Sequence, residues 1–259
     1  MKSARPRHVG VLVACLLLQA QAPSTDEIIV MTSGTFTAAH LELAPDFERS
    51  TKMKVTTAAT SLGVGAASIP SRLQRGEPVD VVIVAGDTLD DLIRDGLVVH
   101  GSRVDLARSS IGMAVRAGAR KPDISTVPAL RRALLEAKSV AVSSSVSGNY
   151  FTNELFPQLG IADRLKGKVR RIEGERVGAV VARGDAEIGF QQISELLPVS
   201  GIDVVGPLPP EVQRVTVFAA GVAAGSKHPD PARAYIRFLA SPTSSSAVAR
   251  SGLESPTVR

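Results

Sequence analysis

The amino-acid sequence predicts an α/β fold built as two lobes. Apolar strand-like runs alternate with segments of helical periodicity from residue 28 to residue 239. The run Val79–Val84 is almost continuously apolar, which is typical of a strand that is buried on both faces of a largely parallel sheet. A strand that ends in a hydroxyl-rich turn occurs twice, at Ile28–Thr35 and at Val140–Gly148. This recurrence indicates two similar lobes.

The first half of the chain is expected to contain three strands, each followed by a helix. The strands are residues 28–31, 54–58 and 79–84, and the helices start near residue 36, end near residue 76 and cover residues 87–95. Pro45 should kink the first helix or mark its second half, because proline lacks the N–H of an internal helical bond. Asp87 is expected to be the N-cap of the third helix, and Gly76 is placed as a C-cap for the second.

The second half continues the alternation. We expect strands at 110–115, 140–143, 169–172, 186–190, 203–205 and 215–219, and helices after Thr126 and at 149–159, 177–183 and 230–239. Pro128 fits the first turn of the helix that Ser125 or Thr126 caps. If the last helix packs beside the first strands, lobe one contains residues 23–108 plus 214–259, and lobe two contains residues 109–213. A ligand would then lie in the cleft between the lobes, at the carboxyl ends of the strands.

Residues 1–22 have the pattern of a cleaved secretory signal peptide. A basic head with Lys2, Arg5 and Arg7 precedes the apolar stretch Val9–Leu18 and the small residue Ala20. The stretch is too short to remain as a membrane span, and the mature chain is expected to contain no transmembrane segment. We therefore expect a periplasmic protein.

The composition excludes several kinds of site. The net charge is +5 for the whole chain and becomes +2 without the signal peptide, and the cations are scattered, so nucleic-acid binding is not expected. Cys15, the sole cysteine, lies in the signal peptide, which excludes disulfides and thiol catalysis in the mature chain. The four histidines have no paired metal spacing, so no metal site and no cofactor are expected.

The two hydroxyl-rich turns are candidate anion-binding segments. Unpaired N–H groups and the helix dipole at a helix N-terminus both favour negative charge, and serine hydroxyls add neutral donors. A serine in a turn often only satisfies its local backbone, but the joint arrangement in both halves favours a ligand. The candidate residues are Ser33, Gly34, Thr35, Ser61, Ser143, Ser145, Ser147, Gln191 and Gln192.

Four segments resemble those of periplasmic molybdate-binding proteins, a family of type II solute-binding proteins. They are Phe47–Val55, Leu73–Val81, Gly184–Phe190 and Ala234–Pro242. The resemblance covers nearly the whole mature chain. It implies a two-lobe periplasmic-binding-protein type II fold, a monomer, and delivery of an oxyanion to the permease of an ABC transporter.

The resemblance also implies which residues contact the ligand, and one of these positions departs from the family's pattern. Ser33 and Ser61 match the family's two hydroxyl contacts in lobe one, and Ser145 to Ser147 fall where lobe two offers backbone amides. Gln192 stands where molybdate binders typically place a tyrosine, which leaves room for a larger, carboxylated ligand. The run Gly189–Leu196 is similar to the branch of the family that contains aconitate isomerase, an enzyme that interconverts trans- and cis-aconitate.

Two functions therefore stay open. One is an exported solute-binding protein that captures a small anion, either an oxyanion or a di- or tricarboxylate. The alternative is a cofactor-free aconitate isomerase on the same fold, which would need a base for an allylic proton shift. His40, Tyr150 and Glu154 lie near the candidate segments, but the sequence selects no catalytic residue among them. Arg72 could present a guanidinium fork to a carboxylate, or it could be an ordinary exposed helix charge.

Overall fold

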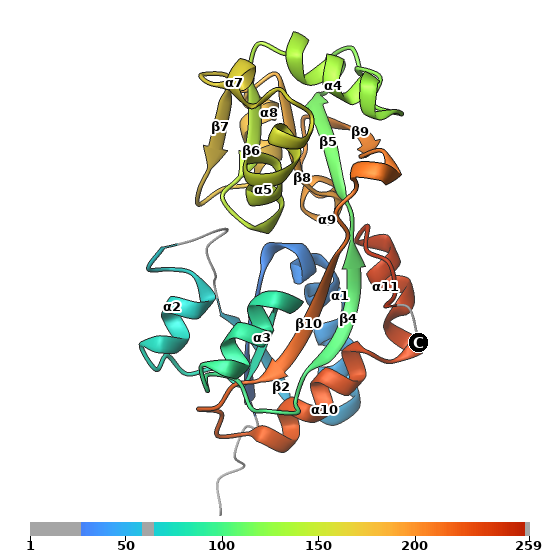
Figure 1. The fold of residues 1–259 in the computed structure, drawn as a ribbon. Helices are drawn as coiled ribbons and strands as arrows, with labels where there is room; N and C mark the ends of the chain where they lie inside the picture. Colours follow the sequence, from blue (N-terminus) through green and yellow to red (C-terminus); the bar gives the residue numbers. More distant parts are fainter. Residues whose placement is uncertain (1–26, 59–64, 257–259) are drawn as a thin grey trace, which may run out of the picture.

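The computed structural model describes residues 27–58 and 65–256. The predicted signal peptide and Ser61 lie outside the described residues. Within them, the strands form two five-stranded sheets, and helices flank both. Figure 1 shows the two sheets at opposite ends of the molecule, each at the centre of its own lobe. The expected two-lobe α/β fold is confirmed.

The first sheet takes its strands from both ends of the chain. Its order is β2 (Lys54–Ala58), β1 (Glu27–Thr32), β3 (Val81–Ala85), β10 (Thr216–Val222) and β4 (Val104–Ser109). Strand β1 pairs in parallel with β2 and β3, while β10 runs antiparallel to β3 and β4. The carboxyl ends of β1 and β3 therefore lie at the same edge, next to the second lobe.

The second sheet takes its strands from the middle of the chain and repeats the same arrangement. Its order is β7 (Val169–Ile172), β6 (Val140–Ser143), β8 (Ile188–Gln192), β5 (Ile111–Arg116) and β9 (Ile202–Pro207). Strand β6 is parallel to β7 and β8, and β5 is antiparallel to β8 and β9. These strand memberships support the predicted lobe boundaries near residues 108 and 213, which stay a prediction.

The expectation of largely parallel pairing was wrong, because both sheets are mixed. The antiparallel strands are those next to the crossings between the lobes. Strand β4 leads into β5 across Ser110 alone, and the chain returns into β10 after β9. The strand by which the chain enters each lobe, β10 or β5, runs antiparallel to both of its neighbours. The strands by which the chain leaves, β4 and β9, run in the same direction as the strands joined by helical crossovers.

The helices are divided between the lobes as the strands are. The first lobe contains α1 (Gly34–Thr51), α2 (Ile69–Gln74), α3 (Gly86–Arg94), α10 (Pro229–Leu239), the 3₁₀ turn η3 (Pro242–Ser244) and α11 (Ser245–Arg250). The second contains α4 (Val127–Glu136), α5 (Val146–Tyr150), the π-helix η1 (Phe151–Leu155), α6 (Phe156–Gln158), α7 (Ala162–Leu165), α8 (Val177–Arg183), α9 (Ile193–Leu196) and the 3₁₀ turn η2 (Pro210–Val212). None of the helices within the described ranges is long and apolar enough to cross a bilayer.

Three local expectations are corrected. Strand β4 was not predicted, because Val104–Ser109 has neither a continuous apolar run nor a strict alternation of apolar and polar residues. Ala85, not Asp87, is the N-cap of α3, and Asp87 lies in its first turn, where its charge still favours the helix dipole. The helix expected from residue 149 begins three residues earlier, at Val146, directly after the second hydroxyl-rich turn.

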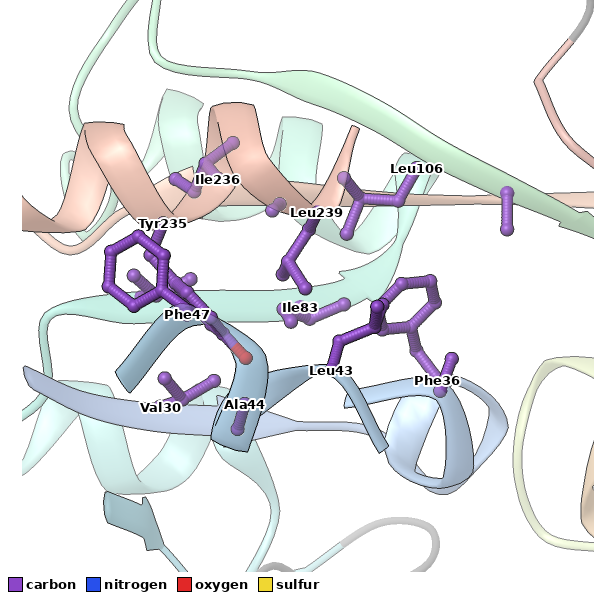
Figure 2. Packing of buried hydrophobic residues seen from close by; sticks show 14 of the residues in the cluster. Val30, Phe36, Leu43, Ala44, Phe47, Ile83, Leu106, Tyr235, Ile236 and Leu239 are labelled. Atoms are coloured by element: carbon purple, nitrogen blue, oxygen red, sulfur yellow. The ribbon is translucent and has the colours of Figure 1, made fainter. Parts of the chain in front are cut away.

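The core of lobe one lies between its sheet and the helices α1 and α10. Apolar residues of α1 spaced by three or four, such as Phe36, Leu43 and Phe47, form one buried stripe. Figure 2 shows this stripe facing Tyr235 and Ile236 of α10, although the two helices are far apart in the sequence. The rings of Phe47 and Tyr235 meet edge to face, with centroids 4.9 Å apart. Helix α10, from the last part of the chain, thus closes the lobe that the N-terminal strands begin.

One side chain ties the two crossings together. The amide of Gln213, just before β10, accepts a hydrogen bond from the backbone N–H of Ile111 and donates one to its carbonyl, both at 2.9 Å. A side-chain amide that pairs with both backbone groups of one residue fixes the local register of the two segments. The edge where the lobes meet is therefore held in a defined geometry.

Candidate functional site

A cavity of about 310 Å³ lies between the two lobes. Its walls come from the turns after β1 and β6, from the ends of β3 and β8, and from the start of α2. The carboxyl ends of the parallel strands in both sheets thus meet at one place, where α/β sheets commonly bind ligands. The volume is at the lower end of the range for small-molecule pockets, about 300–1,000 Å³, which suits a compact ligand.

Lobe one contributes the N-terminus of α1. Ser33 is the N-cap in an extended conformation (φ −66°, ψ 157°), yet its side chain makes no capping hydrogen bond. Serine at this position normally accepts from an N–H of the first turn. Gly34 and Thr35, which also line the cavity, belong to the first turn, where N–H groups have no acceptor within the helix. The hydroxyl and the amides at this helix end therefore lie together at the cavity wall.

Lobe two contributes the serine-rich turn between β6 and α5. The hydroxyl of Ser143 lies 2.9 Å from the hydroxyls of both Ser145 and Ser147. Close packing of strand and helix brings these groups together, because a Cβ on Gly148 would lie 1.6 Å from the carbonyl oxygen of Ser143. Only glycine fits at that position, and the turn depends on it.

The end of β8 completes the wall with two buried glutamines. Gln191 accepts a hydrogen bond from the backbone N–H of Val177 at 2.8 Å through its Oε1. Gln192 Nε2 donates to the hydroxyl of Thr216 on β10 at 3.4 Å, a contact that joins the two lobes. If this amide is rotated by 180°, the contact is kept, because the Thr216 hydroxyl can donate as well as accept. The rotated amide then has an N–H donor at the position that Oε1 occupies.

Three cavity-lining residues have a buried polar atom without a hydrogen-bond partner within the described part of the chain. These atoms are Ser33 Oγ, Ser144 Oγ and Gln192 Oε1. A buried polar group that has lost water and gained no partner costs about 1–3 kcal/mol, so such groups are rare and usually await a ligand or water. The three atoms come from both lobes and meet at one cavity, which is the arrangement of a polar binding site.

The ionisable side chains on the cavity wall are carboxyls. Glu195 of α9 is 5% exposed, and burial raises the pKa of its carboxyl to about 7, although Arg176 and the side chain of Gln191 act in the opposite direction. Glu175 also lines the cavity, but its carboxylate is paired with Arg183. Among the described wall residues there is no lysine, arginine or histidine. The wall thus offers hydroxyls and amides together with one buried carboxyl.

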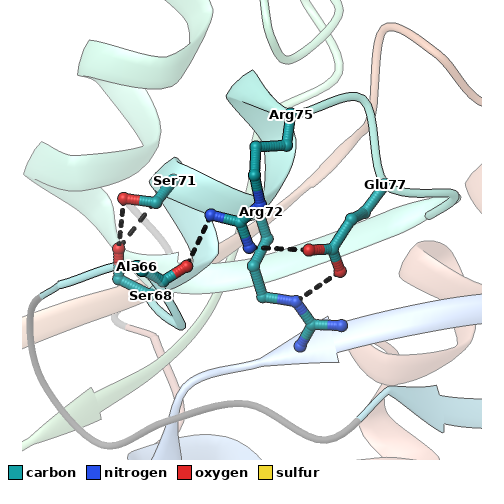
Figure 3. A network of polar contacts seen from close by, with 6 residues as sticks. All are labelled: Ala66, Ser68, Ser71, Arg72, Arg75 and Glu77. Carbon is teal, nitrogen blue, oxygen red and sulfur yellow. Dashed lines mark hydrogen bonds and ion pairs between the residues drawn. The ribbon is translucent and has the colours of Figure 1, made fainter.

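Most of the predicted contact residues lie on this wall. Ser33, Gly34, Thr35, Ser143, Ser145, Ser147, Gln191 and Gln192 all line the cavity. Arg72 is not among the described lining residues, and Figure 3 shows its side chain directed at Glu77. Arg72 Nε lies 2.7 Å from Glu77 Oε2, and Arg75 approaches the other oxygen of the same carboxylate. Arg72 is thus already paired with the carboxylate of Glu77, whereas the sequence suggested a ligand carboxylate as one candidate partner.

The three residues considered as a base also lie away from the described wall. His40 is fully buried in lobe one, where its ring nitrogens lie 2.7 Å from Thr57 Oγ1 and from the Tyr235 hydroxyl. Burial lowers the pKa of His40 to about 4, so the imidazole is neutral. The Tyr150 hydroxyl donates to the carbonyl of Val212, and the exposed Glu154 pairs with Arg214. Within the described ranges, no group of three histidine, cysteine or acidic side chains is arranged to hold a metal ion.

Sequence reasoning did not select Ser144 or Glu195. Ser144 was passed over between Ser143 and Ser145, two candidates of the hydroxyl-rich turn, although its own hydroxyl has no partner among the described residues. A signal for Glu195 was present in the sequence, because it is an acidic residue enclosed by Ile193 and Leu196 directly after a buried strand. An acid in an apolar segment at the carboxyl end of such a strand is a candidate site residue.

Comparison with known proteins gives concordant matches. Residues 28–254 match the family model of the bacterial extracellular solute-binding proteins. The chain is 44% identical over 245 residues to aconitate isomerase of a Pseudomonas species, which covers 94% of this chain and 93% of that protein. It is 29% identical over 195 residues to the molybdate-binding protein ModA of Azotobacter vinelandii, 73% of each chain. The solved structure of the A. vinelandii periplasmic molybdate-binding protein superposes with a TM-score of 0.71 at 20% identity, over 89% of this chain and all of that one.

Proposed function

The chain belongs to the family of bacterial extracellular solute-binding proteins, and we propose that it captures a small anion in the cavity between its lobes. The observation that carries the proposal is a set of buried atoms on one cavity wall that have no hydrogen-bond partner among the described residues: Ser33 Oγ, Ser144 Oγ and Gln192 Oε1. Hydroxyls can donate to an anion from either lobe, and the first-turn amides of α1 add further donors. A ligand held from both sides would satisfy the groups that have no partner in the described part of the chain.

We propose a di- or tricarboxylate as the ligand, with aconitate as the first compound to test. The support is the relative with 44% identity over nearly the full length of both chains, whose name states an action on aconitate. Gln192 is consistent with this choice, because its amide reaches Thr216 across the lobes without the bulk of a phenol. A tetrahedral oxyanion such as molybdate is the competing ligand, since a wall of neutral donors suits it as well.

The family also supports a proposal for cellular setting. We propose that the mature chain, formed by removal of residues 1–22, is a periplasmic monomer and delivers its ligand to an ABC permease. The two lobes would be residues 23–108 plus 214–259 and residues 109–213, in agreement with the strand membership of the two sheets. Ser61, proposed as a second hydroxyl contact of lobe one, and Gly65, which lines the cavity, belong to the same connection between β2 and α2.

A thermal-shift screen tests the proposed binding. The purified mature protein is heated with molybdate, tungstate, sulfate, citrate, and trans- and cis-aconitate in separate samples. A ligand present at about one hundred times its Kd stabilises the folded state by about 2.7 kcal/mol, which gives a clear rise in melting temperature. We expect this rise with aconitate. The proposal would be contradicted if none of the anions raised the melting temperature.

A second candidate function is isomerisation of aconitate in the same cavity. It is favoured by the same relative and by the buried carboxyl of Glu195 on the wall, since an allylic proton shift needs a group that exchanges a proton near neutral pH. Incubation with trans-aconitate and chromatography of the products separates the two functions. Formation of cis-aconitate above the buffer blank would establish an isomerase, and binding without conversion would establish a binding protein.

A further inference from the structure

We propose that Glu195 takes up a proton when an anion enters the cavity between the lobes, so that anion binding is coupled to proton uptake. The inference deepens the proposed function and rests on it, because Glu195 belongs to the wall of the same cavity. According to this proposal, Glu195 determines how the affinity for the anion depends on pH.

The position of Glu195 is fixed by its neighbours. It lies on α9, the short helix that follows β8, and α9 packs against α1 of lobe one as well as against β5 and α8 of lobe two. The side chain of Gln191 lies close enough to the carboxyl group to favour its charged form, and Gln191 is itself held by the N–H of Val177. The carboxyl is therefore held at the cavity wall with 5% of the residue exposed.

Few charges compensate the carboxylate form. Arg176, at the N-terminus of α8, is the cation that acts on Glu195. Glu175 lines the same cavity, and its carboxylate is paired with Arg183. His40 of α1 is directed at Thr57 and Tyr235, and it stays neutral because burial lowers its pKa to about 4. One arginine outside the described cavity wall thus offsets part of the charge of one buried carboxylate.

An entering anion makes the ionised form of Glu195 more costly. Two like charges in a site of low effective dielectric repel each other, which favours the neutral form of the group that can accept a proton. Burial alone already raises the pKa of Glu195 to about 7, so protonation near neutral pH requires only a small further shift. The protonated carboxyl then removes the repulsion and adds an O–H donor to the hydroxyls and amides of the cavity wall.

The coupling predicts a specific pH dependence of affinity. Below about pH 7 Glu195 is already protonated in the empty protein, and the affinity is constant. Above that value the empty protein has lost the proton, and each further pH unit weakens binding by up to about tenfold as one proton must be regained. Replacement of Glu195 by glutamine, which has a similar shape and no charge, removes this dependence.

Isothermal titration calorimetry tests the coupling with trans-aconitate and molybdate as separate probes. Wild type, Glu195→Gln and the control Glu211→Gln, an exposed residue on η2, are titrated between about pH 5.5 and pH 8.5. We expect the affinity of wild type and of Glu211→Gln to fall above neutral pH, and that of Glu195→Gln to stay level. The glutamine variant also corrects for titration of the anion itself.

Proton uptake is measured on wild type independently of any variant. Titrations near pH 8 in buffers of different ionisation enthalpy should give close to one proton taken up per anion, and fewer near pH 6. Anion binding that is equally tight across the range, with no proton uptake, overturns the coupling while leaving the proposed function intact. A wild-type protein that binds neither probe at any pH overturns both.

Discussion

Ser33 is the residue on which the proposed site depends most simply in lobe one. Its hydroxyl is buried and unpaired at the N-terminus of α1, so it stabilises no described part of the protein. Ser33→Ala should therefore weaken anion binding by about 1–3 kcal/mol, because an acceptor on the ligand loses its donor. The melting temperature of the empty protein should change little. Titration with the anion and a thermal melt measure the two quantities.

The matched control is Ser50→Ala at the other end of the same helix. The Ser50 hydroxyl donates to the carbonyl of Phe47 at 2.9 Å, far along the helix from the cavity-lining first turn. This variant should keep wild-type affinity. Equal affinity of wild type and Ser33→Ala would remove Ser33 from the site.

His40 predicts how the stability of the empty protein depends on pH. Burial lowers the pKa of His40 from 6.5 to about 4, so the unfolded chain binds a proton between these values that the folded chain does not. The free energy of unfolding should therefore decrease as pH falls from 6.5 to 4, by up to roughly 3 kcal/mol from this residue. Denaturant unfolding at a series of pH values measures the effect.

The variant His40→Gln isolates this contribution, because glutamine does not titrate. Glu195 contributes with the opposite sign, since its raised pKa makes the folded chain bind the extra proton between 4.5 and about 7. Glu195 is present in both proteins, so the difference between their pH profiles reports on His40 alone. Parallel profiles for wild type and His40→Gln would contradict the assignment of a buried neutral imidazole.

At the scale of elements, the serine-rich turn of lobe two depends on the close approach of α5 to β6. A Cβ at Gly148 would lie 1.6 Å from the carbonyl oxygen of Ser143, so Gly148→Ala must move the helix or the strand. We expect a loss of stability of about 1–3 kcal/mol from overpacking and a weaker anion affinity in the protein that still folds. Thermal melts with and without the anion measure both effects.

Gly225→Ala is the matched control for this change. A Cβ at Gly225 would have no atom within 4 Å, and its backbone is not in the left-handed region. Both the stability and the affinity of this variant should remain close to wild type. A Gly148→Ala protein that behaves like Gly225→Ala would contradict the role of the close approach.

The elements show which parts of the fold could be predicted from the sequence. The strands Lys54–Ala58 and Val169–Ile172 and the helix Val177–Arg183 were predicted with the bounds observed, because apolar periodicity and a C-cap glycine define them locally. Strand β4 and helix α9 were missed, since their form depends on contacts with the other strands and with α1. Contacts between segments that are far apart in the sequence cannot be predicted from local sequence patterns.

The same distinction applies to the candidate site. The hydroxyl-rich turns at Ser33 and Ser145 were predictable, because a strand, a small polar turn and a helix follow one another in the sequence. The partner of Arg72 was not, since Glu77 reaches it through the local fold of the loop after α2. The sequence held a signal for Glu195, but burial and cavity lining were what distinguished this residue from other acidic residues.

At the scale of the whole molecule, the site exists only because the chain crosses between the lobes. Gln213 holds Ile111 at the crossing, and Gln192 reaches Thr216 from one lobe to the other. The wall of the cavity therefore requires both lobes in one arrangement, although each lobe has its own sheet and core. An anion bound between them would add contacts to both and favour the arrangement in which they meet.

The most direct test of the account is titration calorimetry of a variant that removes one unpaired hydroxyl from each lobe, Ser33→Ala/Ser144→Ala. Wild type should bind one aconitate or one molybdate per chain. The double variant should lose about 2–6 kcal/mol of binding free energy if the two hydroxyls act independently. Loss of affinity with an unchanged melting temperature would support a site shared by the lobes. Wild-type affinity in the double variant would contradict it.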